Sequence, residues 1–121
     1  MLVTTLDDIK QYTAQDIAAI VAQAESAARK ACEDYIDNKL GGQDSFPCGF
    51  AWVELFGVRG NTKVGRAFKA LGITKLGTGL YWHNPSRVPV QNVDAKMAGA
   101  VAAQRVLEGY GFTAYAVDRL D

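Results

Sequence analysis

Apolar residues recur at helical spacing in the first third of the chain. Between residues 14 and 39 they step alternately by four and three positions, close to a heptad repeat, at Ile17, Val21, Ala24, Ala28, Ala31 and Tyr35. Thr13 and Asp16 form a capping pattern before this stretch, and Gly41 and Gly42 follow it. The pattern predicts one amphipathic helix over residues 14–39, about 39 Å long.

Period-two alternation marks the next segment, CGFAWVELFGV at residues 48–58. Alternate side chains of a strand point to opposite sides, so Phe50 and Trp52 are predicted to share one side. Because the segment is apolar almost throughout, it predicts a central strand covered on both faces for most of its length. Two further strands are predicted at 80–85 (LYWHNP) and 112–120 (FTAYAVDRL).

Helical spacing returns twice in the second half of the chain. One helix is predicted to begin after Asn61 or Thr62 and to end at Gly72, with an apolar face formed by Val64, Ala67, Phe68 and Leu71. Another is predicted to begin at a cap on Asn92 or Asp94 and to run to about Gly109. The buried side of this helix is rich in small residues, which favours close packing against a neighbouring helix.

Together these patterns predict an α+β fold in a single domain, residues 1–121. A long N-terminal helix, about residues 14–39, precedes an α+β core at about residues 47–121 with the element order β-α-β-α-β. We expect a three-stranded sheet with two helices packed on one face and the long helix across it or outside it. The helix is longer than a core of this size, about 25 Å across. Its apolar stripe therefore predicts a homodimer through residues 14–39, the alternative being a helix that stays against its own protomer.

Composition and charge narrow the class of protein. The 121 residues include 13 Lys and Arg and 13 Asp and Glu, a net charge of zero. Residues 1–44 carry eight acidic and four basic side chains, whereas residues 45–121 carry five acidic and nine basic ones, balances of −4 and +4. No apolar run has the roughly 20 residues that span a bilayer, and the first residues do not have the pattern of a signal peptide. We expect a cytoplasmic protein with a polarised surface and no membrane contact.

The residues that bind metals are few. Cys32 and Cys48 are the only cysteines and His83 is the only histidine, without the spacing of a zinc site. In the cytoplasm two free thiols are expected rather than a disulfide. The sequence therefore predicts no metal site.

The stretch GVRGNTKVGRAFKALG, residues 57–72, has the glycine spacing of a phosphate-binding loop between Gly60 and Gly65. Arg66 and Ala67 then stand where that loop requires Lys and Ser or Thr, and no dinucleotide-binding fingerprint occurs. The pattern excludes both nucleotide sites, and we expect no cofactor.

A weaker anion site remains, because a helix N-terminus attracts negative charge. Five basic residues and no acidic one fall between residues 59 and 75, and aromatic residues follow at 81–83. Basic and aromatic side chains together are typical of nucleic-acid contacts. The predicted residues for a nucleic acid or another anionic ligand are Arg59, Asn61, Lys63, Arg66, Lys69, Trp82 and His83. The alternative is that the basic residues are only the solvated face of an amphipathic helix.

Catalytic patterns are weak. Glu54 lies in an apolar strand, where a carboxylate must pair or face solvent, and we expect an ion pair with Arg59, Arg105 or Arg119. His83 has no nucleophile placed near it in the sequence. We therefore predict no catalytic residue, and an enzyme using Glu54 or His83 remains the weakest of the hypotheses.

Two segments resemble a set of small proteins of tailed phages and prophages. The segments are PCGFAWVELFGVRGNTKVGRAFKALGI and HNPSRVPVQNVDAKMAGAVAAQRVLEGYGFTAYAVDRLD, which span about residues 47–121. The shared features are an aromatic strand, a basic turn and short helix, a Trp-Asn-Pro loop, a Gln-x-x-Asp-Ala-Lys helix start and a final Arg-x-Asp. Here His83 stands between Trp82 and Asn84-Pro85, which is a departure. The resemblance implies a viral source, an accessory role in the infected bacterial cytoplasm and no assigned reaction.

Two functional hypotheses of different class follow. The first is stoichiometric binding of a nucleic acid or another anionic ligand through the basic turn and helix. The alternative is a protein–protein inhibitor of a host enzyme or defence complex, using the acidic helical half at Asp16, Glu33, Asp34 and Asp37.

Overall fold

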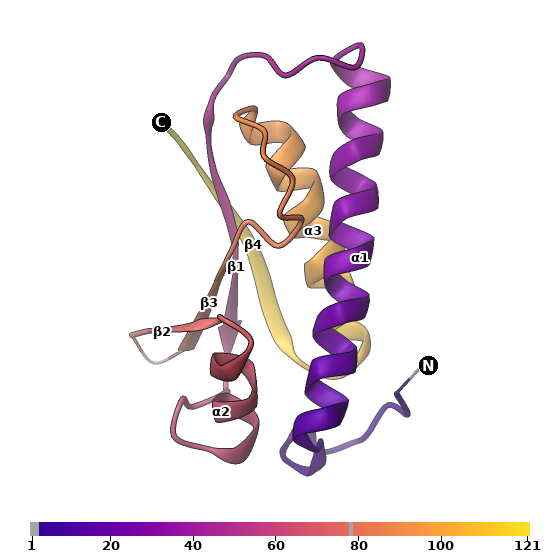
Figure 1. Cartoon of the computed structure of the whole chain (residues 1–121). Coiled ribbons are helices and arrows are strands. Elements are labelled where there is room, and N and C mark those ends of the chain that lie inside the picture. Colours follow the sequence, from indigo (N-terminus) through magenta and orange to yellow (C-terminus); the bar gives the residue numbers. More distant parts are fainter. Residues whose placement is uncertain (1–2, 78) are drawn as a thin grey trace.

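The computed structural model of the chain describes residues 3–77 and 79–121 (Figure 1). One turn of 3-10 helix, Ile9–Gln11, precedes the long first helix. The main elements follow in the order α1 (Ala14–Lys39), β1 (Gly49–Phe56), α2 (Lys63–Ala70), β2 (Thr74–Leu76), β3 (Gly79–His83), α3 (Val93–Gly109) and β4 (Thr113–Leu120). The α+β class and the long N-terminal helix are confirmed.

The strands form one antiparallel sheet of four in the order β2-β3-β1-β4. Each helical crossover, β1-α2-β2 and β3-α3-β4, skips one strand, which is the connectivity of a split β-α-β (ferredoxin-like) unit. The prediction of three strands is wrong. The missed strand, β2, has only three residues, too few for a period of two to be recognised.

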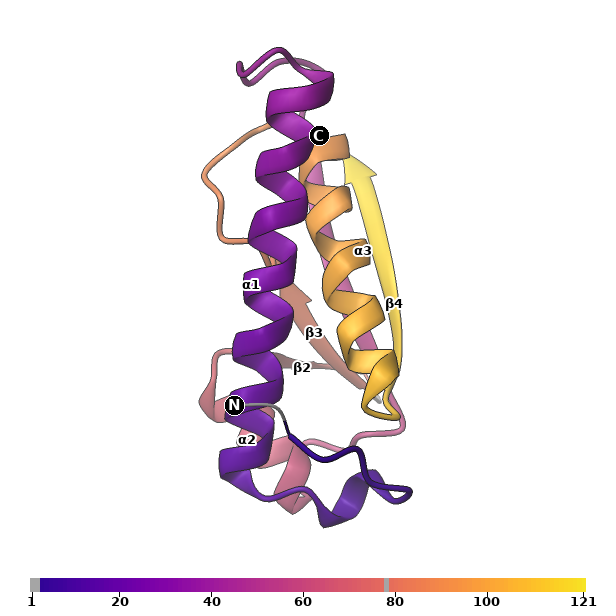
Figure 2. The same cartoon turned by 90° about the vertical axis from the view of Figure 1, so that its right-hand side faces the viewer.

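The helices cover one face of this sheet. In Figure 2, α1 and α3 lie side by side in front of the strands, and α2 lies at the lower end near the start of α1. We expected α2 and α3 to share this face with α1 across or outside it. Instead α1 lies beside α3, and the eight-residue α2 closes the end of the core.

Helix α1 begins at a complete capping box. The Thr13 hydroxyl accepts the Asp16 N–H at 3.0 Å, and the Asp16 carboxylate accepts the Thr13 N–H at 2.9 Å. The buried residues of the helix are Ile17, Ile20, Val21, Ala24, Ala28 and Cys32. Four of the six stripe residues are thus covered within one chain, Ala31 and Tyr35 are half-buried, and the homodimer stays a prediction. Neither α1 nor any other helix in the described ranges is long and apolar enough to cross a membrane.

Small residues let α1 and α3 approach closely. A Cβ added at Gly99 of α3 would lie 3.1 Å from the carbonyl oxygen of Ala28 in α1 and 3.0 Å from the Cβ of Ser86. The small residues that the sequence places on the buried side of α3 thus serve this helix crossing.

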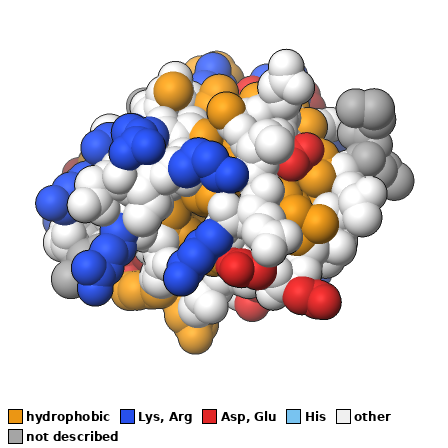
Figure 3. Space-filling view, turned by 90° about the horizontal axis from the view of Figure 1, so that it is seen from below, with side chains coloured by type: hydrophobic (Ala, Val, Ile, Leu, Met, Phe, Trp, Pro, Cys, Tyr) orange, Lys and Arg blue, Asp and Glu red, His pale blue; other side chains and the backbone are white. Residues whose placement is uncertain are grey.

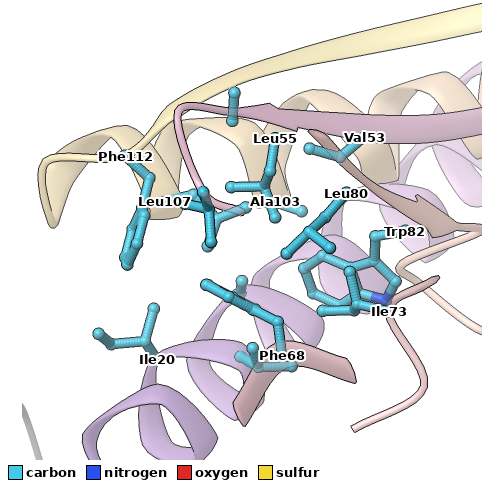
Figure 4. Packing of buried hydrophobic residues seen from close by; sticks show 14 of the residues in the cluster. Ile20, Val53, Leu55, Phe68, Ile73, Leu80, Trp82, Ala103, Leu107 and Phe112 are labelled. Atoms are coloured by element: carbon cyan, nitrogen blue, oxygen red, sulfur yellow. The ribbon is translucent and has the colours of Figure 1, made fainter. Parts of the chain in front are cut away.

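The core lies between the helices and the inner side of the sheet (Figure 4). Phe68 of α2 and Ile73 pack there with Leu80 of β3, and all three are almost completely buried. Fully burying such a side chain stabilises the fold by about 1.5–3 kcal/mol. Phe68 also meets Phe112 edge to face, with ring centres 5.3 Å apart. Helix α2, which carries Lys63, Arg66 and Lys69, is therefore anchored by its apolar side.

Candidate anion-binding site and open sheet face

The turn between β1 and α2 is held tightly against the first turn of the helix. The Thr62 hydroxyl donates to the Arg59 carbonyl at 2.6 Å and accepts the Gly65 N–H at 3.1 Å. A Cβ at Gly65 would lie 1.9 Å from the Arg59 carbonyl oxygen, so no larger residue fits without movement of the backbone. These contacts fix the position from which the Arg59 side chain extends.

Beside this turn lies a hollow of about 430 Å³. Among the residues that the structure describes, its charged lining residues are Arg59, Lys69 of α2 and Lys75 of β2, and none is acidic. Its other lining residues are Gly60, Asn61, Gly77 and Gly79. A Cβ at Gly60 would lie only 3.4 Å from the Lys69 ammonium nitrogen, so the lysine lies directly over bare backbone. The hollow combines three cations with glycine backbone, an arrangement that suits an anion.

The cations extend beyond the hollow onto the exposed side of α2. We call the five exposed residues Arg59, Lys63, Arg66, Lys69 and Lys75 the basic end. None of them forms a salt bridge within residues 3–77 and 79–121, where the ion pairs involve Glu25 and Asp34 instead. Figure 3 shows Lys and Arg side chains gathered on the part of the lower end where α2 lies, with the acidic groups on the other part.

Only some of the predicted site residues lie together in the structure. Arg59, Asn61 and Lys69 line the hollow. Lys63 and Arg66 lie outside it on α2, where the Arg66 guanidinium donates to the Asn61 carbonyl. Lys75 is not among the predicted residues, although it closes the basic run that begins at Arg59. Its role depends on β2 returning beside α2, which the sequence does not reveal.

Trp82 does not lie in the site. It is 5% exposed and packs in the core beside Leu80, as Figure 4 shows. The alternation of β3 places Leu80 and Trp82 on the helix side and Tyr81 and His83 on the opposite side. Trp82 therefore offers no ring face to a ligand, whereas His83 is exposed.

The opposite side of the sheet has no covering helix among the described residues (Figure 1). The prediction that β1 is covered on both faces is therefore wrong, although its central position between β3 and β4 is confirmed. We call this surface the aromatic face; strand pairing places on it Phe50, Trp52, Glu54, Phe56, Thr74, Tyr81, His83, Thr113, Tyr115, Val117 and Arg119.

The rings of the aromatic face contact one another across strands. Trp52 lies opposite His83 and Val117, and its ring centre is 5.6 Å from that of Tyr81. The Tyr81 and His83 rings are stacked, with centres 6.1 Å apart and planes 15° from parallel. Tyr115 remains 55% exposed. The two central strands, β1 and β3, thus carry a connected group of ring surfaces.

Glu54 lies in the middle of this face. Its carboxylate accepts a hydrogen bond from the indole N–H of Trp52 at 3.2 Å. The expected ion pair with Arg59, Arg105 or Arg119 is not formed within the part of the chain that the structure describes. The strand reaches solvent on this side, so the carboxylate needs no cationic partner.

Two cations border the upper end of the aromatic face. The Arg119 guanidinium carbon and the Lys96 ammonium nitrogen each lie 5.5 Å from the centre of the Phe50 ring, within the range of cation–π attraction. The Lys96 ammonium group also donates to the Gly49 carbonyl at 2.8 Å. These contacts hold positive charge next to the first ring of β1.

Burial raises the pKa of the Tyr81 phenol above its ordinary value, and the Glu54 carboxylate raises it further, against an opposing effect of Arg119. The phenol is therefore neutral at physiological pH. It adds an aromatic ring to the face without adding negative charge.

Neither cysteine lines the basic hollow or lies on the aromatic face. Cys32 and Cys48 are both free, as expected, and burial raises the pKa of the Cys32 thiol. No group of three or more His, Cys, Asp or Glu residues in the described ranges is placed to hold a metal ion. Comparisons with protein-family models, with curated proteins and with solved structures found no match.

Proposed function

We propose that this chain is a small phage-type accessory protein that acts by stoichiometric binding of a nucleic acid or another polyanion through its basic end. The observation that carries this proposal is the hollow lined by Arg59, Lys69 and Lys75, three cations that have no acidic partner within residues 3–77 and 79–121. Like charges so close repel one another, and a bound anion relieves that repulsion.

Local structure supports an anionic ligand of extended shape. The hollow accounts for three cations, and Lys63 and Arg66 continue the positive surface along α2. A single small anion would leave these two residues without a role, whereas a chain of phosphates reaches both groups. The positive end of the α2 dipole adds to the same field.

The alternative, inhibition of a host protein through the acidic half of α1, has less support. Two of its four carboxylates already serve the helix itself. Asp16 closes the capping box, and Asp34 pairs with Lys30 at 2.8 Å. Glu33 and Asp37 remain exposed. That surface is accordingly less complete than the basic end.

The test compares two charge-matched double variants in fluorescence anisotropy titrations with a labelled 20-nucleotide DNA, single-stranded and duplex. Lys69→Gln/Lys75→Gln removes two cations of the hollow, and Lys39→Gln/Arg105→Gln removes two exposed cations elsewhere. We expect the first variant to weaken binding about tenfold or more and the second to change it little. Lys63→Gln/Arg66→Gln should weaken binding to a smaller extent.

Salt supplies a second readout. The logarithm of the association constant should fall linearly with the logarithm of the salt concentration. For a variant, the slope of this line should be shallower by about one for each phosphate contact that the substitution removes. Equal losses in the two variants, or no binding of either DNA by the wild-type protein at low salt, would overturn the proposed function. Retention of a host protein through the acidic half of α1, with no nucleic-acid binding, would favour the alternative.

A further inference from the structure

The aromatic face differs in composition from an ordinary apolar interface. Among the side chains that the structure describes, it carries six rings, two threonines, one carboxylate, one guanidinium and one aliphatic group, Val117. Interfaces between proteins also favour aromatic residues, but their cores include aliphatic groups and Met. A surface on which rings outnumber aliphatic groups so clearly favours a ligand that is itself flat.

The rings lie within reach of one another along the two central strands. Phe50 and Trp52 of β1 adjoin His83 and Tyr81 of β3, with ring centres 6.2 Å and 5.6 Å apart in the two pairs. On the same face, towards β4, the ring centres of Phe56 and Tyr115 are 5.7 Å apart. A flat group bound to one pair therefore has a neighbouring platform available for the next flat group of the same ligand.

Positive charge borders this platform at both ends. At the upper end, Arg119 and Lys96 flank the Phe50 ring. At the lower end, Gly79 lines the basic hollow and lies two residues before Tyr81 on the same strand, a separation of about 7 Å. A ligand with both flat groups and phosphates can place its rings between these two clusters of cations.

Glu54 restricts which part of such a ligand crosses the centre. Its carboxylate lies between the rows of rings, paired only with the neutral indole N–H of Trp52 among the described contacts. A phosphate over this position would be repelled, whereas a base can stack on the adjacent ring. The charges therefore place bases over the strands and phosphates towards the borders.

We infer that the aromatic face binds the unpaired bases of a single-stranded nucleic acid, whose phosphates continue onto the basic end. This inference rests on the proposed function, and it narrows the class of ligand from polyanions in general to single-stranded nucleic acids. In a duplex the base faces are stacked on one another and cannot lie on protein rings. In single strands the bases are free to stack, and four-stranded sheets that carry exposed aromatic residues hold two or three bases in this way.

The test uses substitutions that keep apolar bulk and remove only the ring. Tyr81→Leu/Tyr115→Leu retains an apolar surface but loses two stacking platforms, and Tyr81→Phe/Tyr115→Phe is the matched control that retains both rings. The probes are the labelled 20-nucleotide single-stranded and duplex DNAs. We expect the Leu variant to bind single-stranded DNA about tenfold or more weakly. We expect duplex binding, which depends on the basic end, to change less than twofold in either variant.

Intrinsic fluorescence gives an independent readout, because one of the two tryptophans lies on the aromatic face and the other in the core. Single-stranded DNA should quench the Trp52 signal, and the quenching should be absent in Trp52→Phe. Duplex DNA should leave the emission nearly unchanged. Thermal unfolding of each variant checks that the fold is retained.

The outcomes separate this inference from the proposed function. If neither DNA binds the wild-type protein, both fail. If both DNAs bind but the Leu and Phe variants behave alike, the basic end retains its role and the stacking inference is overturned. If the wild-type protein instead self-associates, and the Leu variant abolishes that association without affecting single-stranded binding, the face is an interface between copies of the chain and the inference is also overturned.

Discussion

At the scale of single residues, the position of the basic end depends on a backbone contact that only glycine permits. Gly65 lies in the first turn of α2, where its Cα faces the Arg59 carbonyl. The Thr62 hydroxyl connects the same two residues by donating to one and accepting from the other. The geometry of the site thus depends on the missing side chain of Gly65 as well as on the charged groups.

Replacement of this glycine should be costly. In Gly65→Ala, the new methyl group would lie 1.9 Å from the Arg59 oxygen, so either the turn or the helix must move. Such overpacking against backbone costs about 1–3 kcal/mol, and we expect the upper part of this range or more. Urea unfolding followed by circular dichroism measures the change.

A second glycine provides the control. Gly109, the last residue of α3, has no heavy atom within 4 Å of its added Cβ. Gly109→Ala should leave stability unchanged or raise it by up to about 1 kcal/mol, because alanine favours a helix. Equal effects of the two substitutions would show that the tight contact at Gly65 does not exist in solution.

At the scale of elements, the sequence predicts the helices and strands well, but it predicts poorly which elements pack against one another. The capping box at Thr13 and the bounds of α1 at residues 14 and 39 agree with the structure, since both depend on neighbours in sequence. The alternation of β1 also predicts correctly which side chains share a face. What covers each face depends on segments far away in the chain. The stripe of α1 packs against α3 within the chain, and no helix covers the other side of β1 among the described residues.

In the candidate site, too, the residues that are close in sequence could be predicted and those that depend on distant segments could not. Arg59, Asn61 and Lys69 could be predicted because they lie in one continuous basic segment that leads into a helix. Lys75 was missed because β2 is too short to recognise. Trp82 was included because the phase of β3 is ambiguous in an aromatic run, and a shift of one residue exchanges core and surface.

Asn92 connects two elements that the sequence treats separately. It caps α3 by accepting the Ala95 N–H at 2.9 Å, and its amide group donates to the carbonyls of Ser45 and Phe46 at 2.9 and 3.2 Å. The residue is 1% exposed. Asn92→Ala should therefore cost about 2 kcal/mol, through loss of the cap and of two part-buried hydrogen bonds to the loop before β1.

The same measurement on Thr13→Ala separates the two contributions. Thr13 caps α1 and is exposed, and its hydroxyl accepts only the Asp16 N–H among the described contacts, so its loss should cost only about 1 kcal/mol. If Asn92→Ala costs no more than Thr13→Ala, its contacts with the loop before β1 contribute nothing to stability.

At the scale of the whole molecule, the sheet has one side devoted to folding and the other to exposed rings. Helices α1 and α3 cover the inner side, and α2 and the β2–β3 pair bring the basic end to the lower edge. The long helix, which the sequence suggested as a dimer interface, is used to complete the core. A homodimer through residues 14–39 would compete with contacts that α1 already makes with α3.

The unfolding of the whole chain distinguishes these two uses of α1. If the helix is satisfied within one protomer, the midpoint of thermal unfolding should not change between about 2 and 200 μM protein; an obligate dimer would become more stable with concentration. Ala28→Asp places a charge at the contact with Gly99 and should lower the midpoint equally at every concentration. Ala22→Asp, on the exposed side of α1, is the control and should have little effect. A midpoint that rises with concentration in the wild-type protein and no longer does so in Ala28→Asp would restore the dimer through α1.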